Sequence, residues 1–501
     1  MSAYAFWNIF NKIDTKMKQL IPLVKVLRPG EIRLVKHFFR LESNAEVKKR
    51  AELFDLVLSG KVQTDVKALK KLYKTEKNNS AFSHLKERLR KDILNVLFLQ
   101  DASKKFSTKY ANAEFECRRN YIQADILIAR GVYIPAIKIL ERSIQLADKY
   151  ELAAEKTLIQ QLVRTMTHRI KSEKRLEEYN IGIRKSLELM RELNRVEEIA
   201  HYFSYPQLFK GNKNVNQPEF KINAIQELKN LYEKTNSPKI GFWYYLTMDE
   251  YYTLTSKNKE ALENNLKLME LTKNSPSIYS QANWAGVNMK ISGNLIALMR
   301  YDESLEYGKI AVRSFRKGGI NQFMAMENLF FAYFRNGSYE AAEDILKKVF
   351  EHPAMKANTF YLAKWLYLRA CLEFSNGEFN KAMKTLNENT ELNKDKSGWL
   401  LGYRLLELLI MVEIGDFEWF DFKLENFRKL LQRQKAENVQ RSKVIFNVLK
   451  TLSKMDFDYF DALEKEKNNI RLLEEAQNEL HWDPKGFEVV RFDDWIKSKM
   501  D

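Results

Sequence analysis

Glycine and proline are scarce in this sequence, at 17 and 9 of 501 residues. Average proteins contain more than twice this proportion, about 12% in total, so few tight turns are encoded. Hydrophobic residues make up 45% of the chain, which is ample for a buried core and excludes a disordered polyelectrolyte. Length alone predicts about three domains of ~150 residues, although a repeat array can continue through such a length without a boundary.

Cysteine is rarer still, since only Cys117 and Cys371 are present. No disulfide framework or cysteine zinc site can be built from two thiols so far apart in sequence, and a reducing compartment is implied. The longest apolar stretch, residues 399–412, contains Arg404 and Glu407 and is too short to cross a bilayer. The first residues have no charged region before a short apolar run, so we expect no signal peptide. These observations predict a cytoplasmic protein without membrane spans.

Catalytic motifs are also missing. No two of the six histidines have the spacing of a zinc-binding helix, and no glycine-rich phosphate loop or Gly-x-Ser-x-Gly turn occurs. Adjacent carboxylates such as Glu177 and Glu178 face different directions on a helix and would not converge on one substrate atom. Both cysteines occupy apolar-face positions, which favours buried packing over nucleophilic catalysis. We therefore expect no enzyme activity, no cofactor and no metal.

Positive charge is concentrated at one end of the chain. Residues 1–110 contain 24 Lys and Arg against 11 Asp and Glu, whereas the other 391 residues contain 59 against 55. Apolar spacing predicts a small helical N-terminal module in residues 1–110, with helices at residues 31–41, 45–58, 66–73 and 80–99. A helix-turn-helix is an alternative for residues 66–99, but the interval between its helices is longer than the usual turn.

Such a concentrated charge can attract nucleic acid or an acidic protein. A polyanion would be held through its phosphates without base reading. Interleaved acidic residues such as Glu46, Glu52 and Glu87 would weaken this hypothesis, and lysines that only keep a small module soluble are the competing interpretation. The candidate polyanion-binding residues are Lys48, Lys49, Arg50, Lys67, Lys70, Lys71, Lys86, Arg88, Arg90 and Lys91.

A turn motif recurs beyond residue 110. Its best copies combine a glycine, an aromatic residue two positions later and an alanine three positions after that. Copies from residue 299 to residue 455 are separated by 38, 40, 38 and 40 residues, a regularity typical of helical repeats. The glycine ends one helix with a left-handed residue, and the alanine lets the next helix approach closely. The clear copies are Gly131-Val-Tyr133-x-x-Ala136, Gly337-Ser-Tyr339-x-x-Ala342, Gly377-Glu-Phe379-x-x-Ala382 and Gly415-Asp-Phe417-x-x-Phe420.

The stretch Leu329-Phe-Phe-Ala332-Tyr333-x-x-x-Gly337-x-Tyr339-x-x-Ala342-x-x-x-Leu346 resembles the tetratricopeptide repeat (TPR) signature. The resemblance implies an all-α, right-handed α-solenoid of about eight TPR-like helix pairs. Their period of about 38–42 residues exceeds the 34 of that family and approaches that of HEAT-type arrays. The array is expected at residues 111–480, followed by a C-terminal cap segment at 481–501. Loose motifs at both termini, including Phe487-Glu-Val-Val-Arg-Phe-Asp-Asp-Trp495, also resemble an uncharacterised bacterial helical-repeat family.

A TPR-like solenoid implies a non-catalytic scaffold or adaptor that binds a protein or peptide on its concave face, which the first helix of each pair forms. The alternative is a nucleic-acid-associated regulator that contacts phosphates through its basic module and recruits a partner through the repeats. Degenerate turns are expected near residues 172–177 and 256–261, and a surface loop at 205–220. By analogy with TPR signature positions, the candidate partner-binding residues are Arg118, Tyr121, Asp125, Lys290, Glu327, Asn328 and Arg335.

Overall fold

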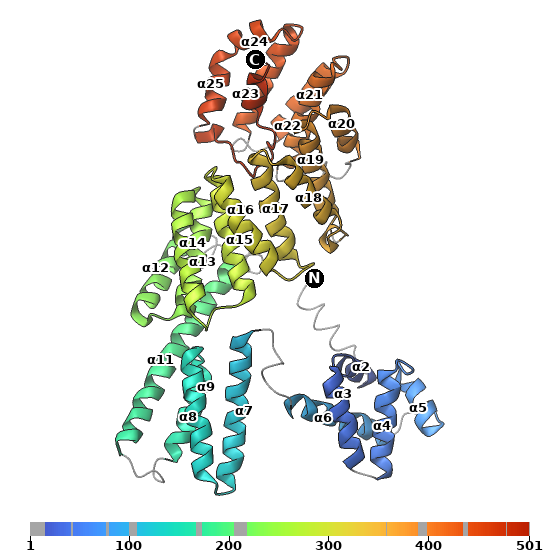
Figure 1. Cartoon of the computed structure of the whole chain (residues 1–501), viewed down its shortest axis with the longest axis vertical. Helices are drawn as coiled ribbons and strands as arrows, with labels where there is room; N and C mark the ends of the chain where they lie inside the picture. The colour runs from blue at the N-terminus through green and yellow to red at the C-terminus, as the bar shows by residue number, and fades with distance from the viewer. Residues whose placement is uncertain are drawn as a thin grey trace. The chain divides into compact units, whose positions relative to one another are not determined.

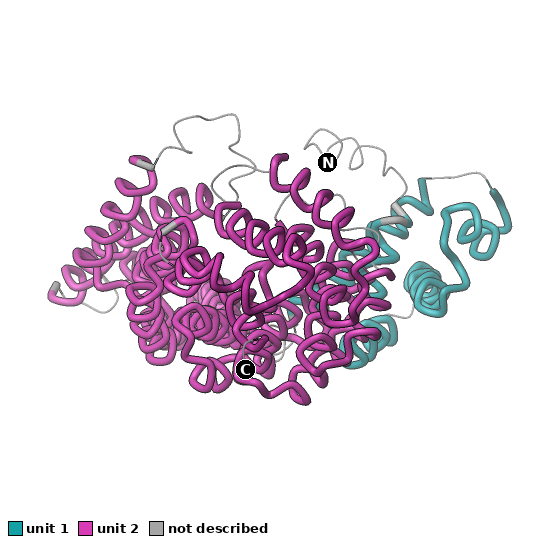
Figure 2. Tube along the Cα trace, turned by 90° about the horizontal axis from the view of Figure 1, so that it is seen from above, with its two compact units in different colours: residues 1–107 teal, residues 108–501 magenta. Residues whose placement is uncertain are grey.

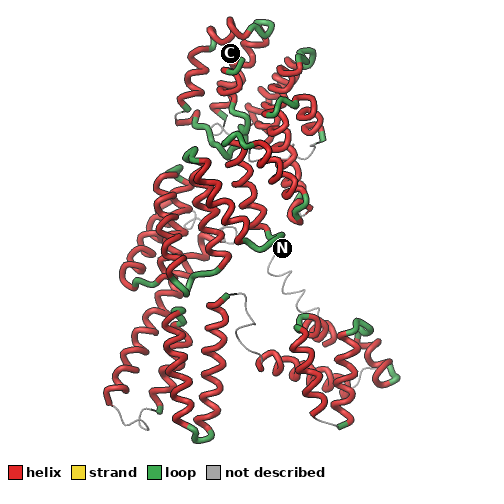
Figure 3. Tube along the Cα trace, viewed as in Figure 1, coloured by secondary structure: helices red, strands yellow, loops and turns green. Residues whose placement is uncertain are grey.

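The computed structural model describes residues 16–41, 44–76, 80–99, 108–166, 173–204, 218–356, 358–388, 398–433, 439–476 and 478–499. Within these ranges the chain is all-α and contains no strand (Figure 3). It divides into two compact units, residues 1–107 and 108–501 (Figures 1 and 2). No helix in these ranges has both the length and the apolar character that crossing a membrane requires.

The first unit is a small helical module with its own core. Leu53, Phe54, Phe82 and Leu89 are fully buried at its centre. The four helices expected from apolar spacing are present with nearly the expected bounds, and a fifth helix, which the sequence did not predict, precedes them. The helices are α2 (Lys16–Lys25), α3 (Pro29–Leu41), α4 (Ala45–Leu58), α5 (Asp65–Tyr73) and α6 (Ser80–Leu99).

The second unit is an array of sequential helix pairs, each packed on the next. Its described residues contain eight pairs, with α12 as an additional helix that packs on α13. The pairs are α7 (Lys109–Ala129) with α8 (Tyr133–Lys149), α9 (Ala153–Thr165) with α11 (Glu173–Ser204), α13 (Pro238–Leu254) with α14 (Asn258–Asn274), α15 (Gln281–Ala297) with α16 (Tyr301–Ser314), α17 (Ile320–Arg335) with α18 (Tyr339–Phe350), α19 (Thr359–Ser375) with α20 (Phe379–Asn387), α21 (Trp399–Ile414) with α22 (Phe420–Arg433), and α23 (Gln440–Lys454) with α24 (Tyr459–Lys465).

Five shorter or unpaired elements complete the described part of this unit. These are α12 (Pro218–Thr235), α25 (Lys467–Glu475), α26 (Phe492–Lys497) and short 3-10 helices at Pro353–Lys356 and Asn478–Leu480. The expected surface loop at 205–220 falls mostly on residues 205–217, which lie outside the described residues. The expected turn at 172–177 begins outside them as well, because α11 starts at Glu173.

The turn glycines have the conformation that the repeat motif predicts. Gly131, Gly337, Gly377 and Gly415 all have φ between 71° and 77°. At Gly337 the backbone amide donates to Phe334 O and the next amide donates to Tyr333 O, the pairing that satisfies the last carbonyls of a helix. The repeat alanines Ala136, Ala342 and Ala382 are fully buried. The TPR-like register read from the sequence is therefore confirmed.

The degenerate copies use other residues for the same turn. Met299 and Ser256 adopt left-handed φ values of 58° and 55°, at a cost of about 1–2 kcal/mol each relative to glycine. Ser256 lies between α13 and α14, inside the turn expected near residues 256–261. The lack of glycine at these positions explains why the motif was weak there.

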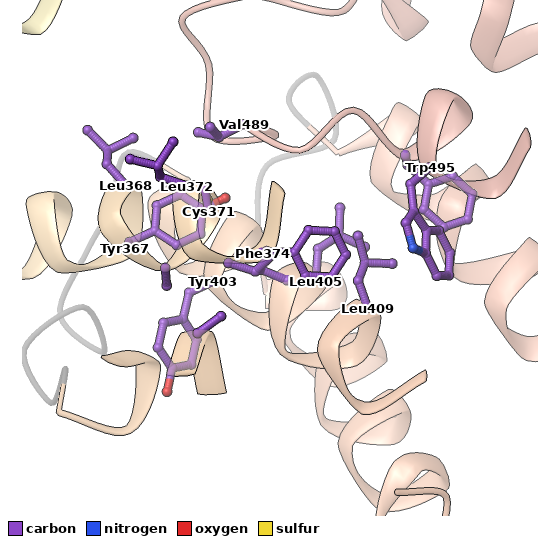
Figure 4. Packing of buried hydrophobic residues seen from close by; sticks show 14 of the residues in the cluster. Tyr367, Leu368, Cys371, Leu372, Phe374, Tyr403, Leu405, Leu409, Val489 and Trp495 are labelled. Carbon is purple, nitrogen blue, oxygen red and sulfur yellow. The ribbon is translucent and has the colours of Figure 1, made fainter. Parts of the chain in front are cut away.

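The largest hydrophobic core lies in the C-terminal half of the array. Side chains from α17, α19, α21 and α23 form it together with residues that follow α25, including Val489 and Trp495. Figure 4 shows Val489 beside Cys371 and Leu372 of α19, at a point where the chain after α25 passes over the first helices. Residues from the end of the sequence therefore belong to the core of the repeats.

Candidate binding site on the first helices of the repeats

The first helices α13, α15, α17, α19 and α21 together form a surface that we call the first-helix wall. Residues 481–491, the C-terminal segment, lie along part of this wall without forming a helix. Arg335 of α17 donates from Nε to Pro484 O at 2.9 Å and from Nη1 to Val489 O at 2.6 Å. Tyr367 of α19 donates to Phe487 O at 2.6 Å. The wall thus holds a non-helical segment of chain, which turns at residues 483–486, through its main-chain carbonyl groups.

A helical glycine permits the close approach of this segment to α21. A Cβ placed on Gly402 would lie 2.6 Å from the Tyr367 hydroxyl and 2.9 Å from the carbonyl carbon of Phe487, and closer still to the Phe487 oxygen. Real Cβ atoms do not approach other heavy atoms so closely. Only glycine at this position lets main chain pack against the helix.

A buried ion network fixes the far end of the segment. The Arg441 guanidinium on α23 forms two hydrogen bonds to the Glu488 carboxylate, at 2.7 and 2.9 Å, and a further ion pair with Asp493. It also donates to Leu473 O at 2.7 Å. The Arg441 side chain is only 8% exposed, and its pKa is raised by these two carboxylates despite the opposing effect of desolvation. Residues 488–493 are therefore a structural anchor.

The near end of the segment borders a cavity of about 690 Å³. Three first helices and the C-terminal segment line it. Its apolar lining includes Met289, Ala297 and the half-exposed Met324. The polar and charged lining residues are Asp249, Thr253, Ser256, Asn258, Lys290, Asn294, Glu327, Asn328, His481, Asp483 and Lys485.

Two charged pairs are formed within the cavity wall. Lys290 Nζ lies 2.5 Å from Asp249, whose carboxylate also accepts a hydrogen bond from buried Asn265. Glu327 is paired with Lys364 of α19 at 2.9 Å. Each pair bridges two different first helices, so these four side chains tie the wall together, and three of them, Asp249, Lys290 and Glu327, also line the cavity.

The structure brings together some of the predicted partner-binding residues. Lys290, Glu327 and Asn328 line the cavity, and Arg335 holds the C-terminal segment beside it. Burial lowers the pKa of Arg335 to about 10, and its guanidinium stacks 4.5 Å from the centre of the Trp482 ring. These four residues lie on one face of the array, and their binding of an external partner stays a prediction.

The other three candidates lie on α7, away from the cavity lining. Arg118 is paired with Glu114 at 2.6 Å and with Glu155 of α9 at 2.7 Å. Tyr121 packs partly buried against the core of the first repeats, and Asp125 is exposed. They remain a separate prediction for this end of the array.

Sequence reasoning missed the residues that complete the site. Asp249, Asn294, Tyr367, Gly402 and Lys485 had no motif to mark them. The motif at 487–495 was visible, but its partners Arg335 and Arg441 are separated from it by more than 40 residues. A single sequence contains no signal for such distant pairs.

Acidic neighbours pair with several of the predicted polyanion-binding residues in the first unit. Lys86 has a side chain only 2% exposed and is paired with Asp65 at 2.7 Å, so its inclusion in a phosphate-binding surface is corrected. The remaining pairs are Arg50 with Asp92, Arg88 with Glu46, Arg90 with Glu87 and Lys70 with Glu76. Glu46 and Glu87 lie among the basic residues and neutralise Arg88 and Arg90, which weakens the polyanion hypothesis.

The other basic candidates are on the surface. Lys49 lies 4.2 Å from the centre of the Tyr73 ring. The remaining four candidates are also exposed, and no ion pair joins them to an acidic group among the described residues. This exposed lysine set consists of Lys48, Lys67, Lys71 and Lys91.

Neither cysteine has the surroundings of a nucleophile. Cys117 and Cys371 are fully buried, and burial raises the pKa of each thiol to about 12. A thiolate is therefore scarce at neutral pH.

In the described ranges no group of three or more His, Cys, Asp and Glu side chains could hold a metal ion.

No protein-family model matches the chain, and no curated protein matches it. Solved structures that are similar to it include the following two. One is a signal transduction ATPase with numerous domains (STAND) with a tetratricopeptide repeat sensor, from Pyrococcus horikoshii, with 14% identity, 85% coverage of this chain and a TM-score of 0.41. The chain spans 64% of that protein's length. The other is the apo form of RapI, with 14% identity, 91% and 98% coverage and a TM-score of 0.37. Similarity at this level does not transfer a function.

Proposed function

We propose that residues 108–499 are a non-catalytic scaffold that binds a protein or peptide segment on the first-helix wall. One observation carries the proposal: the wall holds a non-helical stretch of its own chain through hydrogen bonds to three main-chain carbonyls. Main-chain recognition by side chains on a rigid helical surface is how a repeat array can bind an extended peptide. A wall built to hold one such segment suits a second one beside it.

The cavity next to the C-terminal segment is the place for the partner. Its volume of about 690 Å³ falls within the ~300–1,000 Å³ range of ligand sites. Met289, Met324 and Ala297 offer apolar contacts to a side chain, and methionine adapts readily to different shapes. Amide and charged groups from α13, α15 and α17 surround them. Apolar contacts with a few convergent polar groups favour a short peptide over a flat protein surface.

The experiment first selects peptides that bind the full chain and then tests whether they bind at the cavity. A display library of random octapeptides is selected on the full chain, and affinities of the selected peptides are measured by calorimetry. Met324→Arg places a long cation over the cavity and should weaken binding about tenfold or more. The matched control is Ile320→Arg, because Ile320 is also about half exposed on α17 but does not line the cavity. Equal affinities for both variants would contradict the proposal.

A second candidate function is polyanion contact by the first unit. The exposed lysine set favours it, since these side chains are free of acidic partners among the described residues. Their phosphate contacts would be independent of sequence. The pairing of the other basic residues makes this the weaker of the two candidates.

A further inference from the structure

Lys485 presents a partly buried positive charge that has no counter-ion among the described residues. Its ammonium donates to the Asn328 side-chain oxygen at 2.6 Å, and no carboxylate among the described residues lies within 4 Å of it. The nearby acids are engaged elsewhere: Glu327 pairs with Lys364, and Asp483 accepts the backbone amide of Lys485. Burial lowers the pKa of Lys485 below its usual value. Buried charges are normally paired because desolvation is costly, so this ammonium lacks an expected partner.

A second donor in the same cavity has no acceptor. Asn294 of α15 is 8% exposed, and its side-chain nitrogen has no hydrogen-bond partner. Asn294 and Lys485 both line the cavity together with Asn328. Asn328 is satisfied, because its nitrogen donates to Met289 O at 2.9 Å and its oxygen accepts from Lys485. The spare hydrogen-bonding capacity of these residues thus consists of donors on Lys485 and on Asn294.

We propose that this donor pair binds a carboxylate group of the partner peptide. The inference rests on the proposed function and specifies the chemistry of its ligand. A carboxylate has only acceptor oxygens and one negative charge, which matches one ammonium and one amide nitrogen. Charge-assisted bonds of this kind are among the strongest in proteins.

The surrounding charges favour a single negative charge over a phosphate dianion. Asp249, Glu327 and Asp483 also line the cavity, and the first two are already neutralised by Lys290 and Lys364. A dianion would bring a second negative charge to a site whose one uncompensated cation is Lys485. Repulsion from these acids would therefore oppose it.

Gly293 leaves room for the ligand above these donors. A Cβ at this position would lie 3.5 Å from both Lys485 Nζ and Asn328 Nδ2, so the glycine exposes helix surface directly beside the ammonium. Lys485 belongs to the C-terminal segment and not to a repeat helix. The array is therefore incomplete as a binding site without residues 481–491.

The test uses the full chain and two small probes, N-acetyl-Ala-Ala and its C-terminal amide, at equal ionic strength. Saturation-transfer NMR of the probe methyl groups gives each dissociation constant. The free acid should bind about tenfold more tightly than the amide. Lys485→Met and Asn294→Leu should each reduce this preference, whereas Lys267→Met, a change of an exposed lysine on α14, should leave it intact. Equal binding of acid and amide, absence of saturable acid binding, or an unchanged preference in Lys485→Met would overturn the inference.

The melting temperature of Lys485→Met gives a second readout. Removal of an uncompensated charge in favour of an apolar chain of similar length should leave the melting temperature unchanged or raise it in the absence of anions. A purely structural lysine would give a lower value, which would count against the inference. Met is long enough to fill the same space, so loss of folding is not expected.

The octapeptides separate this inference from the proposed function. Each selected peptide is compared with its C-terminal amide, and with Asp→Asn or Glu→Gln forms where it contains an acid. A loss in one of these arms identifies the terminal or the side-chain carboxylate as the ligand. Suppose that some peptides bind more weakly to Met324→Arg but keep their affinity when their C-terminus is amidated and their acids are replaced. That result would overturn the carboxylate inference while the proposed function stands. Peptides insensitive to Met324→Arg would contradict the proposed function itself.

Discussion

Gly402→Ala adds one methyl group between α21 and the C-terminal segment. The new Cβ would lie 2.6 Å from the Tyr367 hydroxyl and 2.9 Å from the Phe487 carbonyl carbon, and backbone on the other side cannot rotate away as a side chain can. Overpacking of this kind costs about 1–3 kcal/mol. Displacement of Phe487 also breaks its hydrogen bond with buried Tyr367, which adds about 1–3 kcal/mol. We expect a total destabilisation of about 2–6 kcal/mol.

Gly286→Ala is the matched control, because Gly286 also lies in a first helix and a Cβ there would meet nothing within 4 Å. It should stabilise the protein by up to about 1 kcal/mol, since alanine favours a helix over glycine. Urea unfolding followed by circular dichroism measures both variants. Amide hydrogen exchange then locates the effect, with faster exchange expected at residues 481–491 in Gly402→Ala. If the two alanine variants unfold alike and residues 481–491 stay protected, the C-terminal segment does not lie against α21.

Four further predictions concern the repeat core, the buried ion network around Arg441, the thiols and the basic module. Ala342→Arg should be severely destabilising, by more than about 3 kcal/mol, because a fully buried methyl between two helices is replaced by a long cation; an unchanged melting temperature would refute the repeat register. Arg441→Met should cost about 3–5 kcal/mol in urea unfolding, because it leaves Glu488 and Asp493 buried without their cation. Cys117 and Cys371, with pKa values raised to about 12 by burial, should stay protonated and resist alkylation at pH 8 until urea exposes them; rapid modification of the native protein would show that a thiolate is accessible. Changing the exposed lysine set to glutamate should abolish salt-sensitive heparin binding if the first unit contacts polyanions, and no binding by the unmodified chain at low salt would exclude that function.

The turns were predictable because their physics is local. Gly337 must adopt a left-handed φ and Ala342 must be small, and both demands follow from residues within a few positions. The helices of the first unit were predictable for the same reason, since their apolar residues repeat at helical spacing. Helix α2 was missed because it is short and contains Pro22, which normally marks a break.

The candidate site was predictable only in part. The position of Asn328 on the first-helix wall follows from the repeat register, but its bond to Lys485 joins residues 157 positions apart. Arg335 and Pro484 are 149 positions apart. Such contacts depend on how many repeats are stacked and where the chain turns back, and no local pattern encodes either. For Lys86, charge counting failed because the lysine is buried and its partner, Asp65, lies on a different helix.

Amide hydrogen exchange of the full chain, with and without a selected octapeptide, tests the central claim most directly. Binding on the first-helix wall predicts slower exchange in α15 and α17 around the cavity, with α16 and α18 unchanged, because these second helices lie behind the first. Protection confined to α16 and α18, or to the first unit, would contradict the account.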